Sequence, residues 1–132
     1  MIRLVVDPDD ELVRPVWDRW DADNRHVAAP TSLLYELSNA LCRYQRAGQM
    51  SREATLLALR SVLSLPLCLY RDVDLHARAL DLVERYSLPA AYDAHYLALA
   101  DWLEADFWTA DQRLVRAVQD ALPWVRALGA ED

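Results

Sequence analysis

The chain has 132 residues, of which 54% are hydrophobic and 27% charged, a size and composition typical of one folded domain rather than a disordered chain. The formal net charge is −7 and every basic residue is an arginine, so any contact with nucleic acid has to be local, through a few arginines or a bridging metal ion. Gly48 and Gly129 are the two glycines and lysine is absent, which excludes Rossmann-type and Walker-type phosphate loops and a lysine Schiff base.

The first half of the chain is predicted to be mostly helical, because apolar residues recur there at three- and four-residue spacing. Ser51 is a suitable N-cap for one helix, and Gly48 is well placed to end the helix before it. The expected elements are a helix over 8–22, a strand over 26–29, a helix from Thr31 or Ser32 to Gly48, and a helix from Ser51 to 63.

The second half alternates strands and helices. The expected elements are a strand over 66–70, a helix from Asp72 or Asp74 to 86, a helix over 91–103, a strand over 106–109, a helix over 111–118 and a strand over 124–128. Strands separated by helices indicate parallel pairing. The predicted fold class is therefore α/β, a three-layer α/β/α sandwich around a central parallel sheet, formed by a single domain over 1–132.

Three carboxylates stand at or near predicted helix starts. Glu36 lies at the margin of an apolar helix face, Asp93 falls in the first turn of its helix, and Asp111 opens the helix after the strand that ends at Thr109. Taken singly, Glu36 has an alternative interpretation as a surface residue favoured by the helix dipole. Asp93 could be a helix cap or a residue that the helix dipole stabilises, and Asp111 could be a cap. Taken together, they lie at the sheet edge where open parallel sheets bind ligands.

Clustered carboxylates repel one another unless a cation joins them. Mg²⁺ or Mn²⁺ fits such a cluster, because both ions prefer oxygen ligands and share a site with water and a substrate phosphate. We therefore predict that Glu36, Asp93 and Asp111 are metal ligands at a catalytic site. A metal ion there would also explain how an acidic protein engages RNA.

Three stretches carry a resemblance to a known family. They are Leu34-Tyr-Glu-Leu-Ser-Asn-Ala-Leu41, Tyr92-Asp-Ala-His-Tyr-Leu-Ala-Leu-Ala100 and Thr109-Ala-Asp-Gln-Arg-Leu114. In order and spacing they resemble the signature stretches of PIN-domain ribonucleases. The resemblance implies that Glu36, Asp93 and Asp111 bind the metal and that Thr109 supports the site. The implied function is a metal-dependent endoribonuclease most like the VapC class of toxins, held inactive by an antitoxin.

One position departs from the family pattern. PIN domains carry a further aspartate after their first strand, in an Asp-x-Ser/Thr pattern, whereas Asp7 is followed by Pro8 and then Asp9. Two interpretations remain open. In the preferred one, the first strand lies upstream of Met1; in the other, residues 2–6 form that strand and Asp7 is a displaced fourth acid. The departure also favours an alternative function, a non-catalytic PIN-like domain that only binds RNA or a protein partner.

The remaining expectations concern partners and location. RNA is the expected substrate, a cognate antitoxin the expected protein partner, and a homodimer the expected assembly. With no apolar run that could span a bilayer and no signal peptide, the expected location is the cytoplasm. Cys42 and Cys68 are interpreted as small buried hydrophobic residues rather than as a disulfide. The three histidines share no metal-ligand spacing, which argues against zinc.

Overall fold

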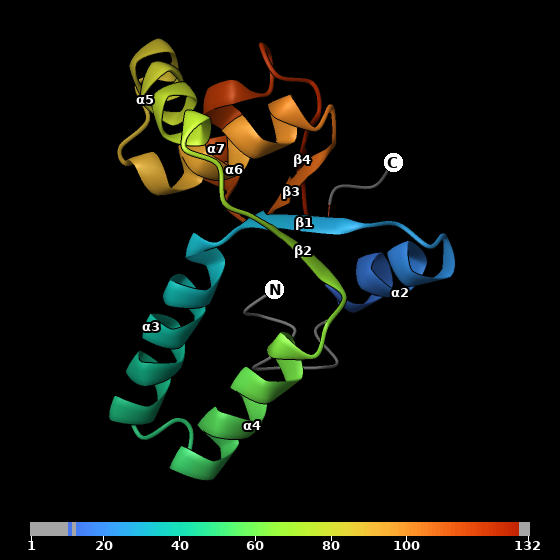
Figure 1. Cartoon of the computed structure of the whole chain (residues 1–132), viewed down its shortest axis with the longest axis vertical. Helices are drawn as coiled ribbons and strands as arrows, with labels where there is room; N and C mark the ends of the chain where they lie inside the picture. Colours follow the sequence, from blue (N-terminus) through green and yellow to red (C-terminus); the bar gives the residue numbers. More distant parts are fainter. Residues whose placement is uncertain (1–10, 12, 130–132) are drawn as a thin grey trace. The chain divides into compact units, whose positions relative to one another are not determined.

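The computed structural model describes residues 11 and 13–129, which divide into two compact units, one within Met1–Leu69 and one within Tyr70–Asp132. Helices and strands are labelled in Figure 1. The helices are α2 (Arg14–Ala22), α3 (Ser32–Arg46), α4 (Arg52–Leu63), α5 (Asp74–Tyr86), α6 (Ala91–Trp102) and α7 (Gln112–Val118). The strands are β1 (Val27–Pro30), β2 (Leu67–Tyr70), β3 (Phe107–Thr109) and β4 (Val125–Ala127).

The first unit is built around a helical hairpin. Helices α3 and α4 pack against each other, as Figure 1 shows, and β1 pairs with β2 in a two-stranded sheet. The hairpin core consists of buried apolar side chains from both helices, namely Leu37, Leu41, Ala58 and Val62. These side chains recur every three or four residues, so each helix turns one apolar stripe toward the other.

Local sequence sets the ends of the two hairpin helices. The Ser51 side chain accepts a hydrogen bond from the Ala54 backbone N–H at 3.1 Å and so caps α4. Gly48 follows α3 with a φ of 72°, a conformation that glycine adopts without a Cβ clash. Thr31 is the N-cap residue of α3, but its side chain makes no capping bond. Its backbone is already helical, whereas residues that cap with a side chain usually have an extended backbone.

The second unit surrounds helix α6. Five of its residues are buried, and the helix packs against both α5 and β3. Its apolar residues are not confined to one stripe, as expected for a helix covered on several sides. Strand β3 pairs with β4 in parallel, with Thr109 opposite Ala127, and α7 packs against β4.

Every element predicted from the sequence has a counterpart among the described residues, with bounds that differ by a few positions. The mixed α/β class is confirmed. The described strands form two two-stranded sheets, β1–β2 and β3–β4. Residues 8–10 and 12 of the first predicted helix lie outside the described part of the chain, and residues 11 and 13 form turns, so the described helix begins at Arg14. Among the residues that are described, no helix combines the length and apolar character needed to cross a membrane.

Candidate functional site

Asp111 is the N-cap of α7. Its backbone is extended, and its Oδ1 atom accepts hydrogen bonds from the backbone N–H groups of Arg113 at 2.8 Å and Leu114 at 3.2 Å. Both bonds use Oδ1, so the Oδ2 atom of this exposed residue takes no part in capping. The capping interpretation of Asp111 is therefore confirmed. Its Oδ2 atom makes neither of the two capping hydrogen bonds.

The turn that contains Asp111 is stabilised by a hydrogen bond to Thr109, the last residue of β3. The Thr109 hydroxyl oxygen accepts a hydrogen bond from the Asp111 backbone N–H at 3.0 Å, and the Thr109 carbonyl accepts one from the Leu128 N–H at 2.8 Å. Arg126, opposite Trp108 in the parallel ladder, bonds Asp106 at 2.9 Å and lies 5.9 Å from the Trp108 ring centroid. Thr109 thus holds the Asp111 turn through its hydroxyl, and its support of a metal site stays a prediction.

Asp93 lies in the first turn of α6, but it is not the cap of that helix. Ala90 occupies the N-cap position with an extended backbone and offers no side-chain capping bond. The Asp93 side chain is half-buried, on a helix whose next residue, Ala94, is fully buried. The packing of Tyr96 against Phe107, with ring centroids 6.1 Å apart, joins this helix to β3.

The charge of Asp93 is disfavoured in the folded protein. Burial raises the pKa of the Asp93 carboxyl above its ordinary value of 3.8, and the negative charge of Asp111 raises it further. Both effects penalise the ionised form, the first by desolvation and the second by repulsion. The charge of Asp111 thus acts on Asp93 within the second unit, and a cation shared by the two carboxylates stays a prediction.

Glu36 belongs to the first unit. It lies on α3 beyond the first turn, is half-buried, and its Oε1 atom is enclosed by protein. The part of the chain that the structure describes has no set of three or more His, Cys, Asp or Glu side chains arranged to hold a metal ion. The convergence of Glu36 with Asp93 and Asp111 stays a prediction. Asp7, the alternative fourth acid, lies outside the described residues.

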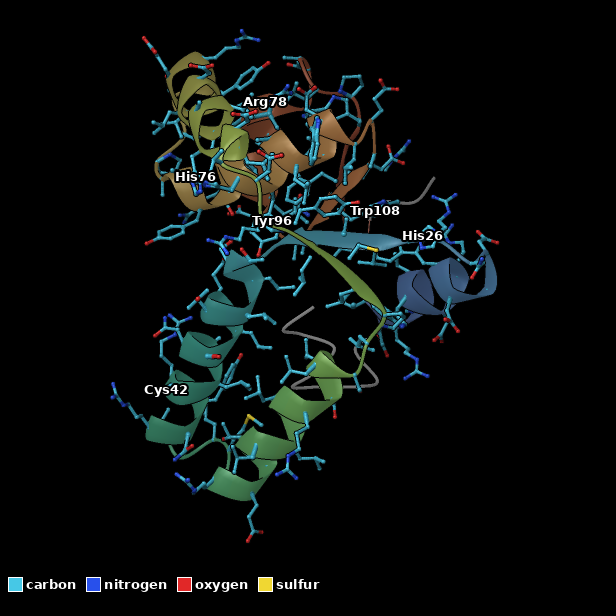
Figure 2. The ribbon with its side chains drawn as sticks, in the orientation of Figure 1. His26, Cys42, His76, Arg78, Tyr96 and Trp108 are labelled. Carbon is cyan, nitrogen blue, oxygen red and sulfur yellow. The ribbon has the colours of Figure 1, made fainter. Side chains whose placement is uncertain are left out.

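A pair of histidines was missed by the sequence analysis. The Nδ1 atom of His76 on α5 lies 2.9 Å from the Nε2 atom of His95 on α6, and Figure 2 labels His76 on its helix. The two residues are 19 positions apart, so no local spacing indicates their contact. The packing of α5 against α6 creates it.

Comparison with protein-family models and curated proteins found no match. The function proposed below therefore rests on the carboxylates and motifs of this chain itself.

Proposed function

We propose that this protein is a Mg²⁺- or Mn²⁺-dependent endoribonuclease, the toxin of a toxin–antitoxin pair, with a PIN-like three-layer sandwich fold. The observation that carries the proposal is the raised pKa of Asp93, caused first by burial of the carboxyl and second by the negative charge of Asp111. A partly buried carboxyl whose pKa is raised by desolvation and a nearby like charge is a common feature of functional sites. The three sequence stretches that resemble PIN domains contain both of these aspartates and Glu36.

The donor set fits the proposed cation. Mg²⁺ is usually bound by one or two carboxylates, with water and substrate phosphate completing its shell. A divalent cation between Asp93 and Asp111 would turn their repulsion into attraction for a common partner. When bound, such an ion activates water and neutralises charge on a phosphate undergoing in-line displacement.

The chain's own residues have distinct parts in this proposal. Asp111 would present Oδ2 while Oδ1 holds the start of α7, which keeps the side chain in one orientation. Asp93 would supply the second carboxylate, and Glu36 the third, from α3. The exposed Arg113 and Arg116 on α7 follow Asp111 and would contact RNA phosphates, which gives an acidic protein a local basic surface.

Cleavage of a fluorescent RNA tests the proposal. The wild-type chain should lose cleavage in EDTA and regain it with Mn²⁺, and Asp93→Asn and Asp111→Asn should each reduce the rate at least about a hundredfold, as for removal of a catalytic charge. Asp120→Asn is the matched control, because it removes one exposed aspartate of the same unit. Cleavage that persists in EDTA, or that survives both site variants, would overturn the proposal.

The predicted convergence of the three acids has its own measurement. Mn²⁺ is paramagnetic and broadens the NMR signals of nearby nuclei. We expect the strongest broadening at the backbone amides of Asp93, Asp111 and Glu36, and weaker broadening at Asp120, beyond the far end of α7. Broadening at the two aspartates without Glu36 would remove Glu36 from the metal site and would contradict the PIN-like arrangement.

The alternative is a non-catalytic PIN-like domain that binds RNA or a protein partner. Two observations favour it: no set of three potential ligands is arranged for a metal within the described residues, and Asp7 is not followed by the family's Ser or Thr pattern. RNA binding without Mn²⁺-dependent cleavage would support this alternative. Purification from the native host tests the toxin part of the proposal, because a toxin should be recovered with a small antitoxin whose removal releases RNA cleavage.

A further inference from the structure

One proton in the paired histidines described above is placed by its hydrogen-bond acceptor. The Nδ1 atom of His95 lies 2.6 Å from the carbonyl oxygen of Ala91, one turn earlier in α6. A carbonyl only accepts hydrogen bonds, so His95 Nδ1 must carry a proton. In the neutral ring Nε2 is then a lone-pair acceptor, and His76 donates its Nδ1–H to it across the 2.9 Å separation.

This arrangement is that of an oriented metal ligand. A histidine that binds a metal through one nitrogen nearly always donates its other N–H to a carboxylate or a backbone carbonyl, which fixes the tautomer and the ring plane. His95 already makes such a bond to Ala91. Its lone pair is on Nε2, where it accepts the Nδ1–H of His76 from the neighbouring helix.

We propose that His76 Nδ1 and His95 Nε2 bind a divalent transition-metal ion of the Zn²⁺ class and so join α5 to α6. Two imidazole nitrogens at Zn–N distances of roughly 2.0–2.1 Å in tetrahedral geometry lie about 3.3 Å apart. The present separation is 2.9 Å, so a small rotation of the exposed His76 side chain opens the required space. The His76 proton moves from Nδ1 to Nε2 through solvent, and the pair as a whole loses none.

The ligand chemistry separates this site from the carboxylates. Imidazole suits Zn²⁺, Ni²⁺ and Cu²⁺, whereas carboxylates with water suit Mg²⁺ and Mn²⁺. With two protein ligands the remaining positions are taken by water, which the exposure of His76 permits. The net charge of −7 favours a cation at the surface. The inference is independent of the proposed ribonuclease function, because it uses neither Asp93 nor Asp111.

Calorimetric titration of the full chain with Zn²⁺, in excess Mg²⁺ to occupy carboxylate sites, tests the proposal. The wild type should bind one ion, and His76→Gln and His95→Gln should each weaken binding by more than about tenfold. His26→Gln is the matched control, because His26 is the remaining histidine and belongs to the first unit. Cys68→Ser, which removes the exposed thiol, should also leave the affinity unchanged.

NMR of the wild-type chain locates the bound ion. Because this measurement uses no variant, it does not depend on whether the variants fold. We expect Zn²⁺ to shift the ¹⁵N resonances of His76 Nδ1 and His95 Nε2, a mixed pattern that neither a chance surface site nor a cysteine site produces. The thermal midpoint of the wild type should rise with Zn²⁺ and that of His76→Gln should not. Shifts at other nitrogens, no binding, or equal binding by His76→Gln would overturn the proposal and leave the pair as an interhelical hydrogen bond.

Discussion

The starts of α6 and α7 look alike in sequence and differ in structure. Each has an aspartate at its beginning, after a turn that precedes an apolar helix. At α7, Asp111 caps the helix with two hydrogen bonds to Oδ1. At α6, the cap position belongs to Ala90, which offers no side-chain acceptor, and Asp93 sits inside the first turn with a raised pKa.

Asp111 therefore has a structural role as a helix cap, whereas Asp93 has no capping role. Helix capping accounts for an aspartate at position 111 even if the residue has no other function. Capping does not account for Asp93, whose charge burial and repulsion make unfavourable. A carboxylate kept where its charge is disfavoured is the stronger functional candidate of the two.

The largest effect on stability should come from removing the cap at α7. Asp111→Ala deletes the acceptor of both capping bonds and should lower the free energy of unfolding by about 1 kcal/mol relative to Asp111→Asn, since asparagine caps as well as aspartate. Urea unfolding of both variants measures the difference. Because both remove the charge that repels Asp93, the comparison isolates the cap. Equal stability of the two variants would show that the cap contributes nothing.

A somewhat smaller effect is expected from supplying the cap that α6 lacks. The backbone of Ala90 is extended (φ −154°, ψ 157°), which is the conformation of a capping residue. Ala90→Ser should therefore raise the free energy of unfolding by about 0.5–1 kcal/mol. Ala117→Ser, an exposed position inside α7, is the matched control and should give no gain. Equal free energies of unfolding for Ala90→Ser and Ala117→Ser would show that a side-chain cap at position 90 does not stabilise α6.

The smallest effect concerns the charge of Asp93. In metal-free buffer at neutral pH, Asp93→Asn should raise the thermal midpoint, because it removes a charge that burial and Asp111 disfavour. The native state of the wild type binds its proton more tightly than the unfolded state does. Its stability therefore falls as the pH rises from the ordinary value of 3.8 through the raised pKa. The advantage of Asp93→Asn should be full above that range and vanish below it.

Melting curves of Asp93→Asn and wild type over a pH series measure this advantage, with Asp120→Asn as the control. On the proposed function, Mn²⁺ should reduce the advantage at neutral pH, because a bound cation stabilises the wild-type carboxylates. An advantage that is independent of pH would refute the charge explanation.

Local features of the fold were predictable from the sequence. The apolar period of α3, the Ser51 cap, the Gly48 terminus and the Asp111 helix start each depend on a few neighbouring residues. Such signals are carried by backbone geometry and short hydrogen bonds, so they survive in any tertiary setting. Thr31 shows the limit, because it holds the expected place without the expected bond.

Features that depend on packing were not predictable in the same way. The position of Asp93 followed from its sequence stretch, but the desolvation that raises its pKa depends on what covers α6. The contact of His76 with His95 joins residues 19 positions apart and appears only when α5 packs on α6. Strand pairing also depends on residues far apart in sequence. The alternation of helices and strands predicts that paired strands are parallel, but it does not predict which strands pair.

The parallel ladder between β3 and β4 has a consequence for the order in which the protein is made. Thr109, which supports the Asp111 turn, pairs with Ala127 and accepts a hydrogen bond from Leu128, both synthesised after α7. A nascent chain on the ribosome therefore lacks the second anchor of this turn until residues 125–128 have left the exit tunnel. The Asp111 turn therefore takes its final form later than a local feature such as the Ser51 cap, whose partners are only a few residues away.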